Sequence, residues 1–257
     1  MELKIVTSKL LKAYSEKVEE SPVAKLDNKQ KYEIPVDYFQ FYKSVSSVYS
    51  SKIEGEDIDF DSYFKHRFLN VKFKPDYTRR ADDLYAAYDF IDSYKLNLSN
   101  VQKAHAILSS NLLPVSQQGL IRTNPMFVIN SDDKIEYVAA EPGIVKEELK
   151  KLFHDIEQLL DANLTDVEIF YYAALIHLVF VKIHPFQDGN GRAARLIEKW
   201  FLLAKIGEKA SAVQLEKNYF TKINDYYSNL KKLGLEYEKL DYGKSLDFLL
   251  MTVTGGL

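Results

Sequence analysis

The hydrophobic positions of this chain are most continuous in one run, FYYAALIHLVFVKI, which ends at Ile183. The run is apolar almost all round the helical period, which is typical of a helix buried in the centre of a core. Before it stand Thr165 and, three residues later, Glu168, which is the spacing of a capping box. Pro185 must end the helix, because the residue before a proline is pushed out of the α region. The pattern therefore predicts a central helix over residues 166–183.

Elsewhere the pattern predicts further helices separated by scattered turns. Two apolar segments, 128–129 and 135–138, flank turn-forming residues at 130–133, which indicates a short β-hairpin. No Gly/Ser/Pro-rich linker divides the chain, so we predict one compact unit. The fold class expected is all-α, with about eight or nine helices and one hairpin. The helices expected lie over residues 4–20, 38–54, 80–96, 101–112, 145–160, 166–183, 191–206, 216–233 and 244–253.

Composition and charge narrow the class of protein. The 257 residues are 46% hydrophobic, which is enough to bury a sizeable core. With 34 basic and 37 acidic residues the net charge is −3, and no basic stripe indicates nucleic-acid binding. The absence of cysteine excludes disulfides and a thiol mechanism. No apolar run reaches membrane-spanning length and the N-terminus lacks the apolar core of a signal peptide, so we expect a soluble, cytoplasmic protein that binds no membrane.

The candidate chemistry follows the central helix directly, in the run HPFQDGNGRAAR that begins at His184. Because His184 follows a buried helix, its imidazole is held on a fixed scaffold at the edge of the core. The loop glycines allow positive φ and close approach of a ligand to the backbone. The next predicted helix, over residues 191–206, presents unpaired N–H groups that form an anion site. Arg192 and Arg195 share one face of its first turn, and their guanidinium groups match phosphate oxygens.

Together these residues indicate a site that holds a polyphosphate and removes a proton beside it. We expect His184 to be the general base that takes the proton of an incoming hydroxyl. Asp188, a carboxylate beside a phosphate site, is most simply explained by Mg²⁺ or Mn²⁺ bridging the two. The phosphate-binding residues expected are Gly189, Asn190 and Gly191 around the α- and β-phosphates, and Arg192 and Arg195 toward the β- and γ-phosphates.

At every fixed position, the run that begins at His184 resembles the signature HxFx(D/E)GNGRxxR of the Fic family. The resemblance implies a protein adenylyltransferase that transfers AMP from ATP to a Tyr, Thr or Ser hydroxyl of a target protein. Gly189 and Arg192 fit this reaction better than that of the kinase-like Doc branch, whose loop carries a bulkier residue and a lysine. The resemblance covers residues 40–240, so we expect an N-terminal helical extension over 1–40 and a Fic domain over 41–257.

A second motif, SSKIEG from Ser50 to Gly55, resembles the Fic inhibitory motif (S/T)xxxE(G/N). It ends a predicted helix that spans residues 38–55 together with Gly55, the expected C-terminal stop. Ser50 and Glu54 then lie on one helical face. The resemblance implies that Glu54 reaches Arg195 and competes with the γ-phosphate for the same guanidinium. In some family members the matching glutamate also activates water to remove AMP, so a bifunctional enzyme is a further expectation.

The resemblance makes the predicted hairpin the flap of a Fic domain, over residues 122–140. Such a flap clamps a target segment by strand addition. This chain has Ala139 and Ala140 where the family commonly has prolines after the tyrosine. A structural hairpin that covers the helices is compatible with the same pattern. The target-docking residues expected are Val128, Ile129, Tyr137 and Val138.

The segment LEKNYFTKINDYYSNL, over residues 215–230, resembles the family helix that borders the adenine. This makes Asn224 and Tyr227 candidate adenine neighbours, and a packed aromatic stripe explains the tyrosines equally well. His177, seven residues before His184 on the buried helix, is expected to be a hydrogen-bonded core residue.

Other functions stay open on the sequence. The nucleotide donor could be GTP, UTP or a CDP-linked group instead of ATP. A nucleotide-binding regulatory module with residual catalysis is the alternative from another class, and the intact His184 argues against it. The partners expected are ATP and an unidentified target protein, with self-modification and a homodimer as further expectations.

Overall fold

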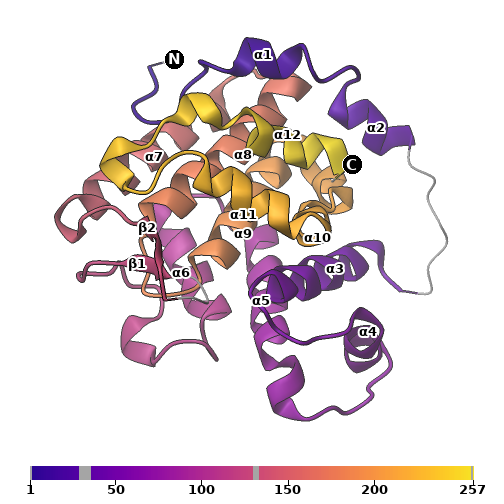
Figure 1. The fold of residues 1–257 in the computed structure, drawn as a ribbon. Helices are drawn as coiled ribbons and strands as arrows, with labels where there is room; N and C mark the ends of the chain where they lie inside the picture. Colours follow the sequence, from indigo (N-terminus) through magenta and orange to yellow (C-terminus); the bar gives the residue numbers. More distant parts are fainter. Residues whose placement is uncertain (1, 29–35, 130–132, 256) are drawn as a thin grey trace.

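The structure is a computed structural model that describes residues 2–28, 36–129, 133–255 and 257. These residues form twelve α-helices and one two-stranded sheet (Figure 1). The helices are α1 (Leu11–Ser15), α2 (Pro22–Asn28), α3 (Tyr38–Ile53), α4 (Phe60–Phe68), α5 (Pro75–Ser93), α6 (Leu98–Leu108), α7 (Pro142–Asp161), α8 (Asp166–Ile183), α9 (Asn190–Ile206), α10 (Leu215–Thr221), α11 (Ile223–Lys231) and α12 (Leu246–Gly255). The strands are β1 (Phe127–Ile129) and β2 (Ile135–Val138). Short 3₁₀ helices lie at Val115–Gln117, Gly207–Ala212, Tyr237–Lys239 and Tyr242–Lys244.

Helix α8 is the centre of the fold. It packs against α7, α9 and α12, and Figure 1 shows it in the middle of the helices. Its capping box forms as expected, since the N–H of Glu168 donates to Thr165 Oγ1 (3.4 Å) and the N–H of Thr165 donates to Glu168 Oε2 (2.8 Å). Nearly every side chain from 169 to 183 is buried. The predicted fold class, all-α with one hairpin, is confirmed.

The helix expected over residues 4–20 is wrong in most of its length. Only Leu11–Ser15 is helical in this segment. The residues before it are held by Asp155 of α7, whose carboxylate accepts from the backbone N–H groups of Lys4 (2.7 Å), Ile5 (2.8 Å) and Val6 (2.8 Å). A distant carboxylate thus satisfies backbone donors that the sequence pattern assigned to a helix.

The helix expected over residues 216–233 is divided at Lys222, where φ is −111° and ψ is 41°. Both halves pack against α12, but α10 packs mainly against α3, so its principal neighbour differs from that of α11. Helices α2 and α4 were not expected, and α5 begins at Pro75, a favourable first helical residue, rather than at residue 80. No helix in the part of the chain that the structure describes has the length and apolar character to span a membrane.

The two strands of the expected hairpin are confirmed. They pair antiparallel, with Phe127 opposite Val138 and Val128 opposite Tyr137. The turn expected at residues 130–133 lies mostly outside the described residues. On its other side β2 meets the chain near α11, since the N–H of Val138 donates to the carbonyl oxygen of Leu235 (2.8 Å). Among the described residues no strand pairs with the outer edge of β1, so this is the open edge of the hairpin.

Candidate active site

His184 ends α8 in the left-handed region, with φ 55° and ψ 59°. Its Nδ1 lies 3.2 Å from the carbonyl oxygen of Val181. Because a carbonyl oxygen only accepts, Nδ1 carries the ring proton and the lone pair of Nε2 is available. Burial lowers the pKa of His184 to about 4. The imidazole is therefore neutral at neutral pH, which is the form that can accept a proton.

Arg122 holds the His184 turn in place. Its Nε donates to the carbonyl oxygen of His184 (2.7 Å), its Nη1 to that of Asn124 (2.7 Å) and its Nη2 to that of Ala140 (2.5 Å). This buried guanidinium joins the end of α8 to both ends of the hairpin segment. Arg122 received no role from the sequence, because no local pattern marks an arginine whose partners are distant backbone carbonyls.

The loop between α8 and α9 is closed by the side chain of Asn190. The N–H of Phe186 donates to Asn190 Oδ1 (2.8 Å), and Asn190 Nδ2 donates to the carbonyl oxygen of Phe186 (2.9 Å). A buried amide needs such partners, and both of its polar groups are used within the loop. The side chain therefore shapes the loop, and the phosphate-binding role expected for Asn190 stays a prediction.

His105 of α6 fastens this loop to the helices beneath it. Its ring stacks on Phe186 with the centroids 3.6 Å apart. Its Nδ1 accepts from the N–H of Gly119 (3.0 Å), so Nε2 carries the proton and donates to the carbonyl oxygen of Asp188 (2.9 Å). Burial lowers the pKa of His105 to about 4 and so favours this neutral form. Gly189 adopts φ 77°, and a Cβ there would lie 3.2 Å from His105 Nε2. A lone histidine in a helix gave no signal of this contact.

The carboxylate of Glu54 lies over the N-terminus of α9. A Cβ built on Gly191 would fall 2.6 Å from Glu54 Oε1, so only glycine leaves room for an anion here. The same oxygen accepts from Arg195 Nη2 at 2.6 Å. Burial by itself would raise the pKa of Glu54, but Arg195 and Arg192 outweigh it and lower the pKa. An ionised carboxylate therefore occupies the anion site that the helix N-terminus creates.

Arg195 is fully buried and faces α3. Its Nε donates to Ser50 Oγ (2.9 Å), and its Nη2 also donates to the carbonyl oxygen of Ser50 (3.2 Å). Its Nη1 donates to the hydroxyl of Tyr226 (3.4 Å). Gly55 follows the end of α3 with φ 84°, as expected of a C-terminal stop. The structure thus brings Ser50 and Glu54 of one motif against Arg195 of the other.

Arg192 has a partner that the sequence did not indicate. Its Nη2 donates to Glu56 Oε1 (3.2 Å), and the same oxygen accepts from Nη1 of Arg80 in α5. Arg192 is only 4% exposed, and its Nε has no hydrogen-bond partner among the described residues. Glu56 and Arg80 were missed because contacts across such sequence separations leave no local pattern.

Asp188 is exposed, and its Oδ1 accepts from the N–H of Gly189 (2.6 Å). In the ranges that the structure describes, no three His, Cys, Asp or Glu side chains converge on a possible metal position. A divalent cation at Asp188 would therefore have a single protein carboxylate and depend on phosphate oxygens of a ligand. Mg²⁺ is commonly bound in this way.

A cavity of about 210 Å³ collects the reactive groups. The hydroxyl of Tyr227, on α11, donates to the carbonyl oxygen of Ile53 (3.1 Å). An adjoining open cavity is lined by Asn224 and also by Tyr227. Of the two expected adenine neighbours, Tyr227 therefore borders both cavities, whereas Asn224 borders the adjoining one. The lining of the main cavity includes Glu54, His184, Gly191, Arg195 and Tyr227.

The side chain of Tyr137 anchors the hairpin to α8. Its hydroxyl donates to the carbonyl oxygen of Lys182 (2.6 Å), and Lys182 Nζ lies 4.0 Å from the centre of its ring. Only 6% of Tyr137 is exposed, because the ring packs β2 onto α8. Tyr137 lines the main cavity together with Val128, whereas Val138 is half-buried and Ile129 is 56% exposed.

His177 is confirmed as a hydrogen-bonded core histidine. Its Nδ1 lies 2.7 Å from Glu198 Oε2 and its Nε2 lies 3.0 Å from the hydroxyl of Tyr226. The hydroxyl of Tyr226 also accepts from Arg195, so this buried network links His177 to the signature arginine.

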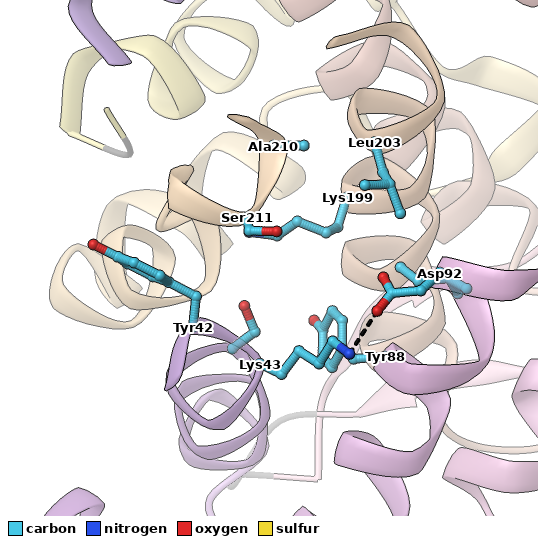
Figure 2. Close-up of a pocket in the computed structure, with 10 residues that line it drawn as sticks. Tyr42, Lys43, Tyr88, Asp92, Lys199, Leu203, Ala210 and Ser211 are labelled. Atoms are coloured by element: carbon cyan, nitrogen blue, oxygen red, sulfur yellow. Dashed lines mark ion pairs between the residues drawn. The ribbon is translucent and has the colours of Figure 1, made fainter. Parts of the chain in front are cut away.

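A second cavity, between α3, α5 and α9, is too small for a substrate. Figure 2 shows Lys43 of α3 directed toward Asp92 of α5, and their ion pair is 2.5 Å long. Lys199 of α9 forms part of the opposite wall. The cavity measures about 20 Å³, which is room for about one water molecule. This small cavity is therefore no candidate for the site of the reaction.

Two named proteins resemble part of this chain. Protein adenylyltransferase fic-1 of Caenorhabditis elegans is 30% identical over 103 residues, which are 40% of this chain and 18% of that protein. Protein adenylyltransferase Fic of Nematostella vectensis is 26% identical over 140 residues, which are 53% of this chain and 31% of that protein. The chain thus spans less than a third of the length of these two relatives.

Solved structures share the fold. A Fic family protein from Desulfovibrio desulfuricans superposes with a TM-score of 0.74 at 16% identity, covering 100% of this chain and 75% of that one. A Fic domain containing signaling protein from Bacteroides thetaiotaomicron gives 0.66 at 17% identity, covering 96% and 91%. The family model described as Fic/DOC family matches residues 95–202. Residues 95–202 of this chain therefore match the Fic/DOC family, and the matched range includes the whole signature of residues 184–195.

Proposed function

We propose that this chain is a protein adenylyltransferase, which transfers AMP from ATP to a hydroxyl group of a protein. The observation that carries the proposal is that one cavity contains a neutral His184 and the anion site of Gly191 and Arg195. A base and a phosphate cradle in one cavity suit attack of a hydroxyl on a phosphorus atom. The names of the two relatives support the same reaction.

In the proposed reaction Nε2 of His184 takes the proton of the acceptor hydroxyl, and the oxygen attacks the α-phosphorus of ATP. A new P–O bond forms while the bond from the α-phosphorus to its bridging oxygen breaks, and pyrophosphate leaves with the electron pair. The N-terminal N–H groups of α9, with Arg192 and Arg195, stabilise the charge on the leaving phosphates. Asp188 would hold Mg²⁺, which would supply neutralising charge at the phosphates.

We also propose that Glu54 restrains this reaction. Its carboxylate lies 2.6 Å from Arg195 Nη2 and covers Gly191, where a phosphate of ATP would bind. Two anions cannot share the same donors, so ATP can enter only with its phosphates displaced. The α-phosphorus would then be out of line with a hydroxyl at His184.

The test compares wild type, Glu54→Gly and the double variant Glu54→Gly/His184→Ala. Each protein is incubated with Mg²⁺ and α-labelled ATP and then analysed by intact mass. We expect Glu54→Gly to gain AMP units at least about tenfold faster than wild type, because one charged competitor is removed. The double variant should bind ATP and gain no mass. Glu16→Gly, which changes an exposed acidic C-cap residue of α1, is the matched control and should behave as wild type.

Each departure from this result has a definite meaning. Transfer by the double variant would remove His184 as the base. If Glu54→Gly gained AMP no faster than wild type, Glu54 would not restrain the reaction. A mass gain from GTP, UTP or a CDP-linked donor but not from ATP would change the donor. Nucleotide binding without transfer from any donor would make this chain a nucleotide-binding module.

A further inference from the structure

Two arginines converge on a single carboxylate oxygen beside the phosphate cradle. Arg192, from the first turn of α9, and Arg80, from α5, both donate to Oε1 of Glu56. Each arginine also has a buried Nε that lacks a hydrogen-bond partner among the described residues. Buried guanidinium N–H groups without acceptors are uncommon, and they indicate a ligand that supplies more acceptor oxygens than one carboxylate does.

The turn after α3 explains why two carboxylates reach two arginines. Gly55 takes φ 84°, and the N–H of Glu56 donates back to the carbonyl oxygen of Ser51 (3.2 Å). This reversal places Glu54 and Glu56 on either side of one glycine. Glu54 then pairs with Arg195 at 2.6 Å, and Glu56 pairs with Arg192 at 3.2 Å. In this state both signature arginines have a protein carboxylate as their anionic partner.

We propose that Arg80 is a third arginine of the triphosphate site and that Glu56 is a second carboxylate competing for that site. This inference rests on the proposed function. A carboxylate oxygen and a phosphate oxygen accept the same guanidinium N–H bonds, so the position of Glu56 Oε1 marks where a phosphate oxygen can be held. Arg192 and Arg195 are the residues expected to face the β- and γ-phosphates, and within this proposal the phosphate that reaches Arg80 is the terminal one. Glu56 therefore opposes ATP more strongly than ADP.

The test measures the dissociation constants of ATP and ADP, each with Mg²⁺, by titration calorimetry. All proteins carry Glu54→Gly, so that the first carboxylate does not mask the second. We expect Glu56→Gln to strengthen ATP binding about fivefold to tenfold, as one partly exposed charged competitor is neutralised. ADP binding should change less than about twofold, because ADP lacks the phosphate that reaches Arg80. Arg80→Met added to Glu56→Gln should cancel the gain for ATP.

Two matched controls come from adjacent positions. Asp57→Asn neutralises the next acidic residue, which is exposed. Arg79→Met removes the next arginine of α5, which pairs with Asp76 on the helix surface. Neither substitution should change the affinity ratio of ATP to ADP.

Three results would overturn the inference. Unchanged or weaker ATP binding in Glu56→Gln would mean that Glu56 holds Arg192 in place and does not compete. If Glu56→Gln strengthened the binding of ATP and ADP equally, the group that competes with Glu56 would not be the terminal phosphate. A gain that survives Arg80→Met would remove Arg80 from the site. If Glu54→Gly still transferred AMP, any of these three results would leave the proposed function intact. If no variant bound a nucleotide, both the proposed function and this inference would be overturned.

Discussion

The reactive form of His184 depends on two backbone carbonyl groups. The carbonyl of Val181 holds Nδ1 and so selects the tautomer with an available Nε2. The carbonyl of His184 itself is held by Arg122 Nε at 2.7 Å. The backbone at His184 is left-handed, which is unfavourable for a residue other than glycine, so it needs such support. Arg122 is therefore a positioning residue for the proposed base.

At the residue scale we predict that Arg122→Lys slows transfer without weakening ATP binding. A lysine has one nitrogen and cannot reach the carbonyls of His184, Asn124 and Ala140 together. In a Glu54→Gly background, we expect kcat to fall at least about tenfold and the free energy of unfolding to fall by about 1–3 kcal/mol. Single-turnover transfer, ATP titration and urea unfolding measure the three effects. Arg79→Lys is the control, and a stability loss with an unchanged rate would contradict the positioning role.

At the scale of elements, the open edge of the hairpin includes the backbone of Phe127. Antiparallel strands alternate residues that bond to the partner strand with residues that face away. The N–H of Ala139 donates to the carbonyl oxygen of Met126 (3.0 Å), so Met126 faces β2 and Phe127 faces the open edge. Val138, which lies opposite Phe127 in β2, follows the same alternation. Its N–H points away from β1 and donates to the carbonyl oxygen of Leu235. We infer that the backbone of Phe127 is the first contact for a target strand.

We predict that Phe127→Pro impairs target modification more than Phe127→Ala does. Both substitutions remove the ring, but only proline removes the outward N–H. In a Glu54→Gly background, labelled AMP incorporation into the proteins of a cell lysate should be about fivefold lower for the proline variant, the effect of about one net hydrogen bond. The ATP dissociation constants of the two variants should agree. Equal incorporation by both would show that no target strand pairs at this position.

At the scale of the whole molecule, two buried histidines and the half-buried His184 link stability to pH. Burial lowers the pKa of His105 and of His184 to about 4, and it also lowers the pKa of His177. In the unfolded chain a histidine titrates near pH 6.5. Between pH 6.5 and pH 4 the unfolded chain therefore binds protons that the folded protein does not. Stability must fall as the pH falls through this window.

We predict that the free energy of unfolding decreases by at least about 2 kcal/mol between pH 7 and pH 5. Urea unfolding at pH 7, 6 and 5 measures this change. His105→Gln retains a donor and an acceptor but does not titrate, so it should make the decrease visibly smaller. The prediction would be contradicted if the free energy of unfolding were constant from pH 7 to pH 5, or if His105→Gln lost as much of it as wild type.

The elements that could be predicted are those that local patterns specify. The all-round apolar run and its capping box predicted α8 to the residue, because both depend on contacts within four positions. The N-terminal helix failed because Asp155, on α7, binds the backbone of residues 4–6. The helix predicted across Lys222 failed because its first half packs mainly on α3, whereas its second half packs on α12. Local helix propensity depends on neighbouring residues, so it cannot indicate either of these long-range contacts.

The sequence by itself determined the composition of the site. The spacing from His184 to Arg195 places a base, a glycine turn and two arginines around one helix N-terminus, and this follows from backbone geometry alone. The contact of Glu54 with Arg195 was expected from a second motif, but only the tertiary structure decided which other groups orient that site. Glu56, Arg80, Arg122 and His105 reach it from elements far apart in the sequence. Such contacts depend on how helices pack, and helix packing is a property of the whole core that no short segment encodes.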